Sequence, residues 1–74
     1  MGTFTTNYYP DEIAESLCQL AGVEDTDVCA AAEDVLYDLK SICENELNKD
    51  KFRTLYRLLE AVTKEAQRGL YDIF

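Results

Sequence analysis

The segment "DTDVCAAAEDVLYDLKSIC", residues 25–43, decides the predicted fold. Its apolar residues recur at spacings of three and four, which is the period of an α-helix and not of a β-strand. Asp25 or Thr26 can cap the start of this helix through a side-chain oxygen. We therefore predict a helix over 26–47. The side chains expected to point inward are Val28, Val35, Leu39 and Cys43.

Two further helices flank this segment. Pro10 suits a first helical position and Gly22 ends a helix by adopting a left-handed conformation, so a helix is predicted over 10–21. A third helix is predicted over 50–70, where an apolar stripe continues at helical spacing and Leu58 widens it. The first helix should bury Ile13, Leu17 and Leu20, with Ala14 and Ala21 at the margin. The stripe of the third comprises Phe52, Leu55, Tyr56, Leu59, Val62, Ala66, Leu70 and Ile73.

These elements predict a small all-α fold in one domain, residues 1–74. The second and third helices are long and joined by a short polar link, which favours an antiparallel helical hairpin. The short first helix should pack on the open side of this hairpin. Residues 1–9 are expected to form an extended arm that lays Phe4, Tyr8 and Tyr9 on the helices.

The length and apolar pattern set further expectations. A domain of 74 residues buries only about 60% of its unfolded surface, which leaves a narrow margin of stability. No apolar run approaches the roughly 18 residues that would span a bilayer, and no secretory signal is visible. We expect a cytoplasmic protein, with homodimer formation as one route to added stability.

The cysteines, Cys18, Cys29 and Cys43, are an odd set without a CxxC pair. Cys29 and Cys43 lie 14 residues apart on one predicted helix, a separation of about 21 Å along its axis. A disulfide requires Cα atoms within about 7 Å, so these two cannot bridge within the chain. We expect reduced, buried thiols.

Charge is distributed unevenly along the sequence. The net charge is −8, and no Lys, Arg or His precedes Lys40. Residues 1–39 carry nine acidic side chains, whereas residues 40–74 carry six acidic and seven basic ones. The negative electrostatic field that results opposes binding to nucleic acid or to anionic membranes, and it attracts a basic surface. The predicted partner-binding residues are Asp11, Glu15, Glu24, Asp25, Asp27, Glu33, Asp34, Tyr37, Asp38 and Glu44.

The basic residues of the third helix allow two interpretations. Arg53, Arg57, Lys64 and Arg68 are spaced four, seven and four apart, so they line one edge. They either pair across the hairpin with Glu33 and Glu44 or meet an anionic partner. The surrounding negative field favours the internal pairing.

Catalysis, cofactors and metal binding are not expected from the residue types. The chain has no histidine, which removes the commonest general base and many zinc sites. No phosphate-binding or dinucleotide-binding glycine motif occurs. A three-helix body of this size also offers little room for a concave active site.

The charge pattern leads to a functional hypothesis. Asp34 and Asp38 repel each other at a helical spacing of four, and no lysine relieves them, so we infer that the negative field has a use. Carboxylates on a rigid helical body can imitate the phosphates of nucleic acid. We therefore expect an inhibitor that occupies the basic site of a nucleic-acid-binding protein. By analogy, such inhibitors are encoded by phages and other mobile elements against host nucleases or defence systems.

Two other classes compete with this hypothesis. A structural or adaptor module would self-associate or dock through an apolar C-terminal surface. A transcription regulator would need the basic edge of the third helix to dominate its surroundings. The apolar surface would comprise Leu58, Leu70, Tyr71, Ile73 and Phe74.

Overall fold

The computed structural model describes residues 4–45 and 50–72, with side chains as far as residue 69. Three helices account for most of these residues: α1 (Pro10–Ala21), α2 (Thr26–Glu44) and α3 (Asp50–Asp72). No strand occurs in the described ranges, and residues 4–9 form an extended arm ahead of α1. The predicted all-α fold of three helices is confirmed.

The helix ends follow local backbone chemistry. Gly22 has a φ of 71°, and its N–H and that of Val23 close the end of α1 on carbonyl groups of the last turn. Asp25 caps α2 by accepting a hydrogen bond from the N–H of Asp27 at 2.9 Å. α2 ends before the predicted residue 47 because Asn45 is extended, with φ −81° and ψ 125°. α3 continues slightly beyond the predicted residue 70.

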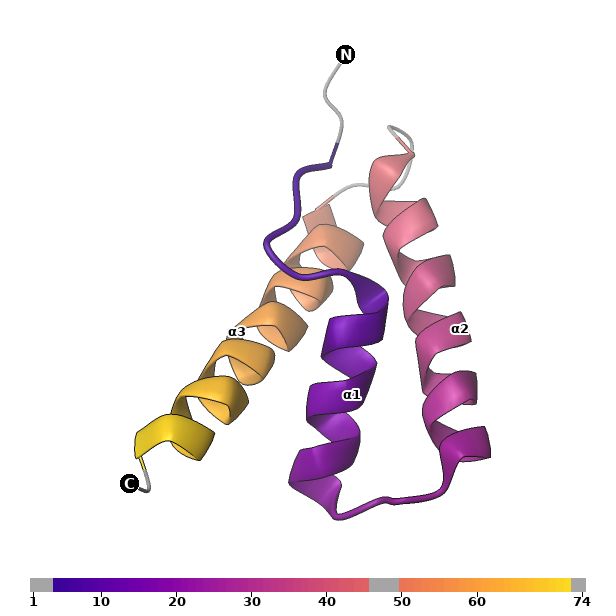
Figure 1. Cartoon of the computed structure of the whole chain (residues 1–74). Coiled ribbons are helices and arrows are strands. Elements are labelled where there is room, and N and C mark those ends of the chain that lie inside the picture. The colour runs from indigo at the N-terminus through magenta and orange to yellow at the C-terminus, as the bar shows by residue number, and fades with distance from the viewer. Residues whose placement is uncertain (1–3, 46–49, 73–74) are drawn as a thin grey trace.

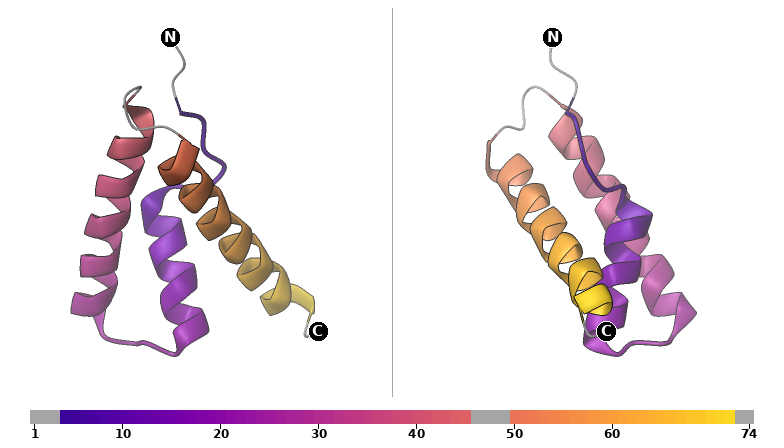
Figure 2. Two further views of the ribbon diagram at one scale, coloured as in Figure 1. Left: turned by 180° about the vertical axis from the view of Figure 1, so that it is seen from behind. Right: turned by 60° about the vertical axis from the view of Figure 1, so that its left-hand side comes forward.

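Consecutive helices run antiparallel, with α1 between the other two (Figure 1). α1 packs more extensively on α2 than on α3, and α2 and α3 touch each other least. The views in Figure 2 show α2 and α3 close together near their connection and diverging toward the opposite end. The molecule measures 43 × 27 × 15 Å along its principal axes. Its shortest dimension only slightly exceeds the diameter of one helix, which is about 10–12 Å.

The core lies where the three helices and the arm meet. Its buried members are Ile13 and Ala14 of α1, Leu36 and Cys43 of α2, and Tyr56 of α3. Leu17, Leu39 and Leu59 pack against these residues and stay partly accessible. All described buried polar side-chain atoms have hydrogen-bond partners.

The predicted inward face of α2 is wrong for two of its four residues. Cys43 is fully buried and Leu39 packs on the core, but Val28 and Val35 are 49% and 65% exposed. The apolar residues of α2 occupy a wider part of the helix surface than α1 and α3 cover. Val28 and Val35 lie outside the covered part. Leu20, near the end of α1, is likewise 58% exposed.

The arm is held by one carboxylate of α3. Oε2 of Glu60 accepts hydrogen bonds from the hydroxyl of Thr6, from the N–H of Asn7 at 2.6 Å and from the N–H of Tyr8 at 2.9 Å. Its Oε1 accepts from Nη1 of Arg57 at 2.6 Å. Glu60 is only 4% exposed, so these donors replace the water that a buried carboxylate loses.

Further contacts hold the arm against α3. The hydroxyl of Tyr56 donates to the carbonyl of Tyr8 at 2.8 Å. The ring of Phe4 meets that of Tyr56 edge to face, with centroids 5.1 Å apart. The guanidinium of Arg57 lies 4.8 Å from the Phe4 centroid and also donates to the carbonyl of Thr5. The arm therefore completes the core by covering Tyr56.

Opposing effects act on the pKa of Glu60. Burial raises it, but the hydrogen bonds from the arm and from Arg57 favour the carboxylate more strongly and hold the pKa below its usual value. A carboxyl group with a depressed pKa contributes stability above its unfolded pKa of about 4.3. That contribution disappears as the pH falls through the lower pKa of the folded state.

Replacing Glu60 with Gln should lower the free energy of unfolding by roughly 2 kcal/mol at neutral pH, because the amide turns an NH₂ group toward N–H donors. The variant should also lose less stability on acidification than the wild type. Urea unfolding followed by circular dichroism at several pH values measures both effects.

Glu65→Gln is the matched control for this experiment. Glu65 lies on the same helix, is exposed, and forms no ion pair or hydrogen bond with a described residue. Equal losses of stability in the two variants would show that the carboxylate of Glu60 has no special role in holding the arm.

Candidate protein-binding surface

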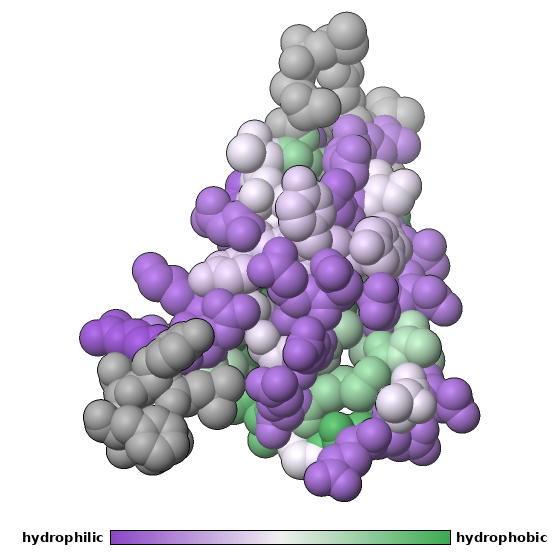
Figure 3. Space-filling model, in the orientation of Figure 1, coloured by the Kyte–Doolittle hydropathy of each residue, from purple (hydrophilic) through white to green (hydrophobic). Residues whose placement is uncertain are grey.

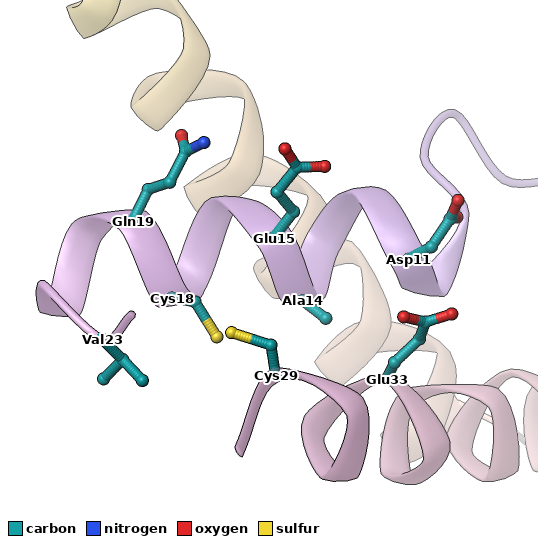
Figure 4. Close-up of a pocket in the computed structure, with 8 residues that line it drawn as sticks. All are labelled: Asp11, Ala14, Glu15, Cys18, Gln19, Val23, Cys29 and Glu33. Carbon is teal, nitrogen blue, oxygen red and sulfur yellow. The ribbon is translucent and has the colours of Figure 1, made fainter. Parts of the chain in front are cut away.

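Carboxylates from two helices meet beside a cleft between α1 and α2. Asp11 and Glu15 of α1 and Glu33 of α2 line this cleft, which has a volume of about 270 Å³ (Figure 4). Ala14, which is 2% exposed, lines the same cleft. Three of the predicted binding residues are thus brought together from separate helices.

Other predicted residues extend this charge around α2. Asp34, Tyr37 and Asp38 are exposed, and Tyr37 is 48% accessible. At 100° per residue, Tyr37 lies between Glu33 and Asp34 around the helix. We call the resulting surface the acidic band. It comprises Asp11, Glu15, Glu33, Asp34, Tyr37 and Asp38.

The acids of the α1–α2 loop lie at one end of the molecule. Glu24, Asp25 and Asp27 are exposed. The side chain of Asp25 is occupied in capping α2. In the orientation of Figure 1, hydrophilic side chains cover much of the visible face, and a hydrophobic area lies toward the α1–α2 loop (Figure 3).

Glu44 differs from the other predicted binding residues because it is paired. Nζ of Lys40 donates to Oε1 of Glu44 at 2.6 Å, one helical turn away. This hydrogen bond raises the pKa of Lys40 above its usual value. The ammonium of Lys40 also lies 5.8 Å from the ring centroid of Tyr9. The negative charge of Glu44 is therefore compensated locally.

The basic residues of α3 do not neutralise the acidic band. Nε of Arg53 donates to the carbonyl of Cys43 at 2.9 Å, which helps to close the end of α2. Arg57 pairs with Glu60 and binds the arm. The predicted pairing of this edge with Glu33 and Glu44 is wrong. No acid of the band forms an ion pair within the part of the chain that the structure describes.

A second surface is apolar and uncovered. It combines Val28 and Val35 of α2 with Leu55, Leu58 and Val62 of α3, each at least 41% exposed. On each helix these residues lie beside a leucine that packs on the core, Leu39 on α2 and Leu59 on α3. They extend from those leucines away from α1 and the arm. We call this surface the exposed apolar face.

The predicted C-terminal contact surface is only partly described. Leu58 is 59% exposed and belongs to the exposed apolar face. The side chains of Leu70, Tyr71, Ile73 and Phe74 lie outside the described residues. Next to the face, Leu20 of α1 and Val62 of α3 help to line a shallow depression.

Membrane-spanning helices and metal-binding clusters are both absent from the described residues. No helix among them has both the length and the apolar character to cross a membrane. No group of three or more His, Cys, Asp or Glu side chains in the same ranges is arranged to hold a metal ion.

Comparison with protein families, with curated proteins and with solved structures gives no match. The acidic band and the exposed apolar face are therefore the features of the chain that bear on its function.

The absence of compensating charge has a measurable consequence. Replacing both Asp34 and Asp38 with Asn should raise the free energy of unfolding by about 0.3 kcal/mol, because it removes like-charge repulsion across one helical turn. The gain should shrink at high salt, which screens exposed charges. Urea unfolding at two ionic strengths measures it.

Glu44→Gln provides the opposite case, since it removes the pairing with Lys40. Stability should fall slightly, within the about 0–1 kcal/mol expected of an exposed ion pair. A loss of stability in the Asp34 and Asp38 variant as well would mean that these carboxylates have stabilising partners.

Proposed function

We propose that this protein is an inhibitor that binds the basic surface of a nucleic-acid-binding protein through its acidic band. The observation that carries the proposal is that no carboxylate of the band forms an ion pair with a described residue, while Arg53 and Arg57 are engaged elsewhere. Four of the five acidic residues are exposed, and Glu33 is partly buried. Exposed charges of one sign strengthen the local field and accelerate association with an oppositely charged surface.

The geometry of the band fits a partner that normally holds a phosphate backbone. Its acids project from two packed helices, so their separations are fixed before binding and little ordering entropy is lost. Tyr37 offers an aromatic contact amid the charges, and aromatic residues often contribute strongly to binding energy. A partner surface rich in Arg and Lys would gain charge-assisted hydrogen bonds from these carboxylates.

The proposed inhibitor would act in the cytoplasm, where it would block a nuclease or a defence system. By analogy with known inhibitors of this kind, it would be encoded by a phage or another mobile element. The proposed partner is a basic protein. Nucleic acid itself would be repelled by the net charge of −8.

We expect the affinity for the partner to depend on the charges of the acidic band. The tagged full-length chain should capture a basic protein from its native host, and mass spectrometry should identify it. Replacing Asp34 and Asp38 with Lys should weaken the purified complex at least about tenfold, because attractive contacts become repulsive. Affinity for the wild-type chain should also fall steeply as salt rises.

A matched charge change keeps this experiment specific. Asp50→Lys with Glu65→Lys alters the net charge equally, at exposed positions on α3 that lie outside the acidic band. This variant should bind nearly as well as the wild type. Equal weakening by both pairs of substitutions, or binding that is insensitive to salt, would refute the role of the band.

The exposed apolar face supports a second candidate function, a structural module that self-associates or docks into an assembly. Small monomeric proteins rarely leave large contiguous apolar surface in water. Leu58 and Val35 are the most exposed members of the face, at 59% and 65%. Burying this face against a second copy would also add to a core that is thin for three helices.

Self-association predicts an oligomer that depends on these side chains. Sedimentation at increasing protein concentration should show a dimer, which Leu58→Asp or Val35→Asp disperses because a charge in the buried contact is costly. Tyr37→Asp changes an exposed aromatic on a different face and should leave the dimer intact. A wild-type chain that stays monomeric at all accessible concentrations would exclude this function.

A further inference from the structure

Two cysteines from different helices face each other in the cleft between α1 and α2. Cys18 lies in α1 and Cys29 in the first turn of α2, and their sulfur atoms point toward one another (Figure 4). Both thiols are free and they share a hydrogen bond. The loop between the helices folds back to produce this arrangement, although only 11 positions separate the two residues.

The environment of this pair differs from that of the third cysteine. Cys18 and Cys29 help to line an open cleft, and Cys29 is only half-buried. Cys43 is 0% exposed and belongs to the core cluster around Tyr56. Cys18 is 8% exposed and Cys43 is fully buried, so a small oxidant reaches Cys29 first, with Cys18 next to it in the same cleft.

We propose that Cys18 and Cys29 form a redox-active dithiol, which a peroxide converts into an intramolecular disulfide that joins α1 to α2. The inference rests on facing thiols from two packed helices at a solvent-accessible cleft. It requires no partner protein, so it stands independently of the proposed inhibition.

The chemistry proceeds in two balanced steps. One cysteine, as its thiolate, attacks a peroxide oxygen; the O–O bond breaks, and the products are a sulfenic acid and, from hydrogen peroxide, water. The second sulfur then attacks the sulfenic sulfur, an S–S bond forms and a second water leaves. In sum, two thiols lose two protons and two electrons while one hydrogen peroxide is reduced to two waters.

The raised pKa of Cys29 makes this thiol slow to react at neutral pH. The hydrogen bond with Cys18, followed by burial and by nearby negative charge, raises the pKa of Cys29 to about 11. The thiolate is the reactive form, so the oxidation should accelerate in mildly alkaline buffer. The carboxylates of Asp25 and Glu15 contribute to this shift, and they also repel anionic thiols such as glutathione.

Trypsin cleavage sites separate the cysteine pair from Cys43, which allows the predicted disulfide to be detected directly. Trypsin cuts after Lys40 and Lys49, so Cys18 and Cys29 remain on peptide 1–40 while Cys43 falls on peptide 41–49. The folded, reduced chain is treated with hydrogen peroxide at low protein concentration, alkylated with N-ethylmaleimide and digested. Peptide 1–40 should then be unalkylated and about 2 Da lighter than its dithiol form, for the two hydrogens lost. Peptide 41–49 should remain alkylated.

A denatured control separates folded geometry from chance collision. In denaturant, the pairs 18–29 and 29–43 are 11 and 14 positions apart, so their closure entropies are similar and both links should form at rates within about a few-fold of each other. In the folded protein, the 18–29 link should form at least about tenfold faster than any link to Cys43, since the fold holds only that pair together.

Variants complete the test. Cys43→Ser should still form the link, whereas Cys18→Ser and Cys29→Ser should each leave peptide 1–40 with one alkylated cysteine. The wild-type digest decides the question even where a variant folds poorly. Oxidation of Cys43 at an equal rate, links between chains, or peptide 1–40 that stays fully alkylated would overturn the proposal.

Discussion

The buried carboxylate of Glu60 is the interaction on which the rest of the structure depends. It collects the N–H groups of the arm on one oxygen and the guanidinium of Arg57 on the other. The side of α3 that faces the arm is consequently polar, with Thr63 buried beside Glu60. Because this polar side is turned inward, the apolar residues of α3 are displaced toward a neighbouring side, where Leu55, Leu58 and Val62 stay accessible.

This rotation of α3 gives the molecule two distinct surfaces. The acidic band lies on α1 and α2, and in the described ranges none of its acids forms an ion pair with a basic residue of α3. Arg57 is instead committed to Glu60 and the arm. The exposed apolar face lies on the parts of α2 and α3 that α1 leaves uncovered. Each surface costs stability in the isolated chain, one through repulsion and the other through hydrated apolar area. Contact with another protein would relieve either cost.

The helices could be predicted because their signals are local. Pro10, Gly22 and Asp25 mark ends through the chemistry of one or two neighbouring residues, and the observed ends agree closely. The directions of the side chains were harder to predict. Val28 and Val35 fit an apolar stripe, but which part of a wide stripe is buried depends on where the other helices lie. The contact between Cys18 and Cys29 was likewise missed, because helical spacing relates residues only within one helix.

Glu60 gave no recognisable signal, since its partners in the arm precede it by 52 to 54 residues. That separation also orders events during synthesis. At about 5–20 residues per second, the ribosome needs several seconds between making the arm and making the carboxylate that anchors it. The nascent chain therefore passes through this interval with the arm unanchored. Mutual repulsion among its many carboxylates would then keep neighbouring nascent chains on a polysome apart.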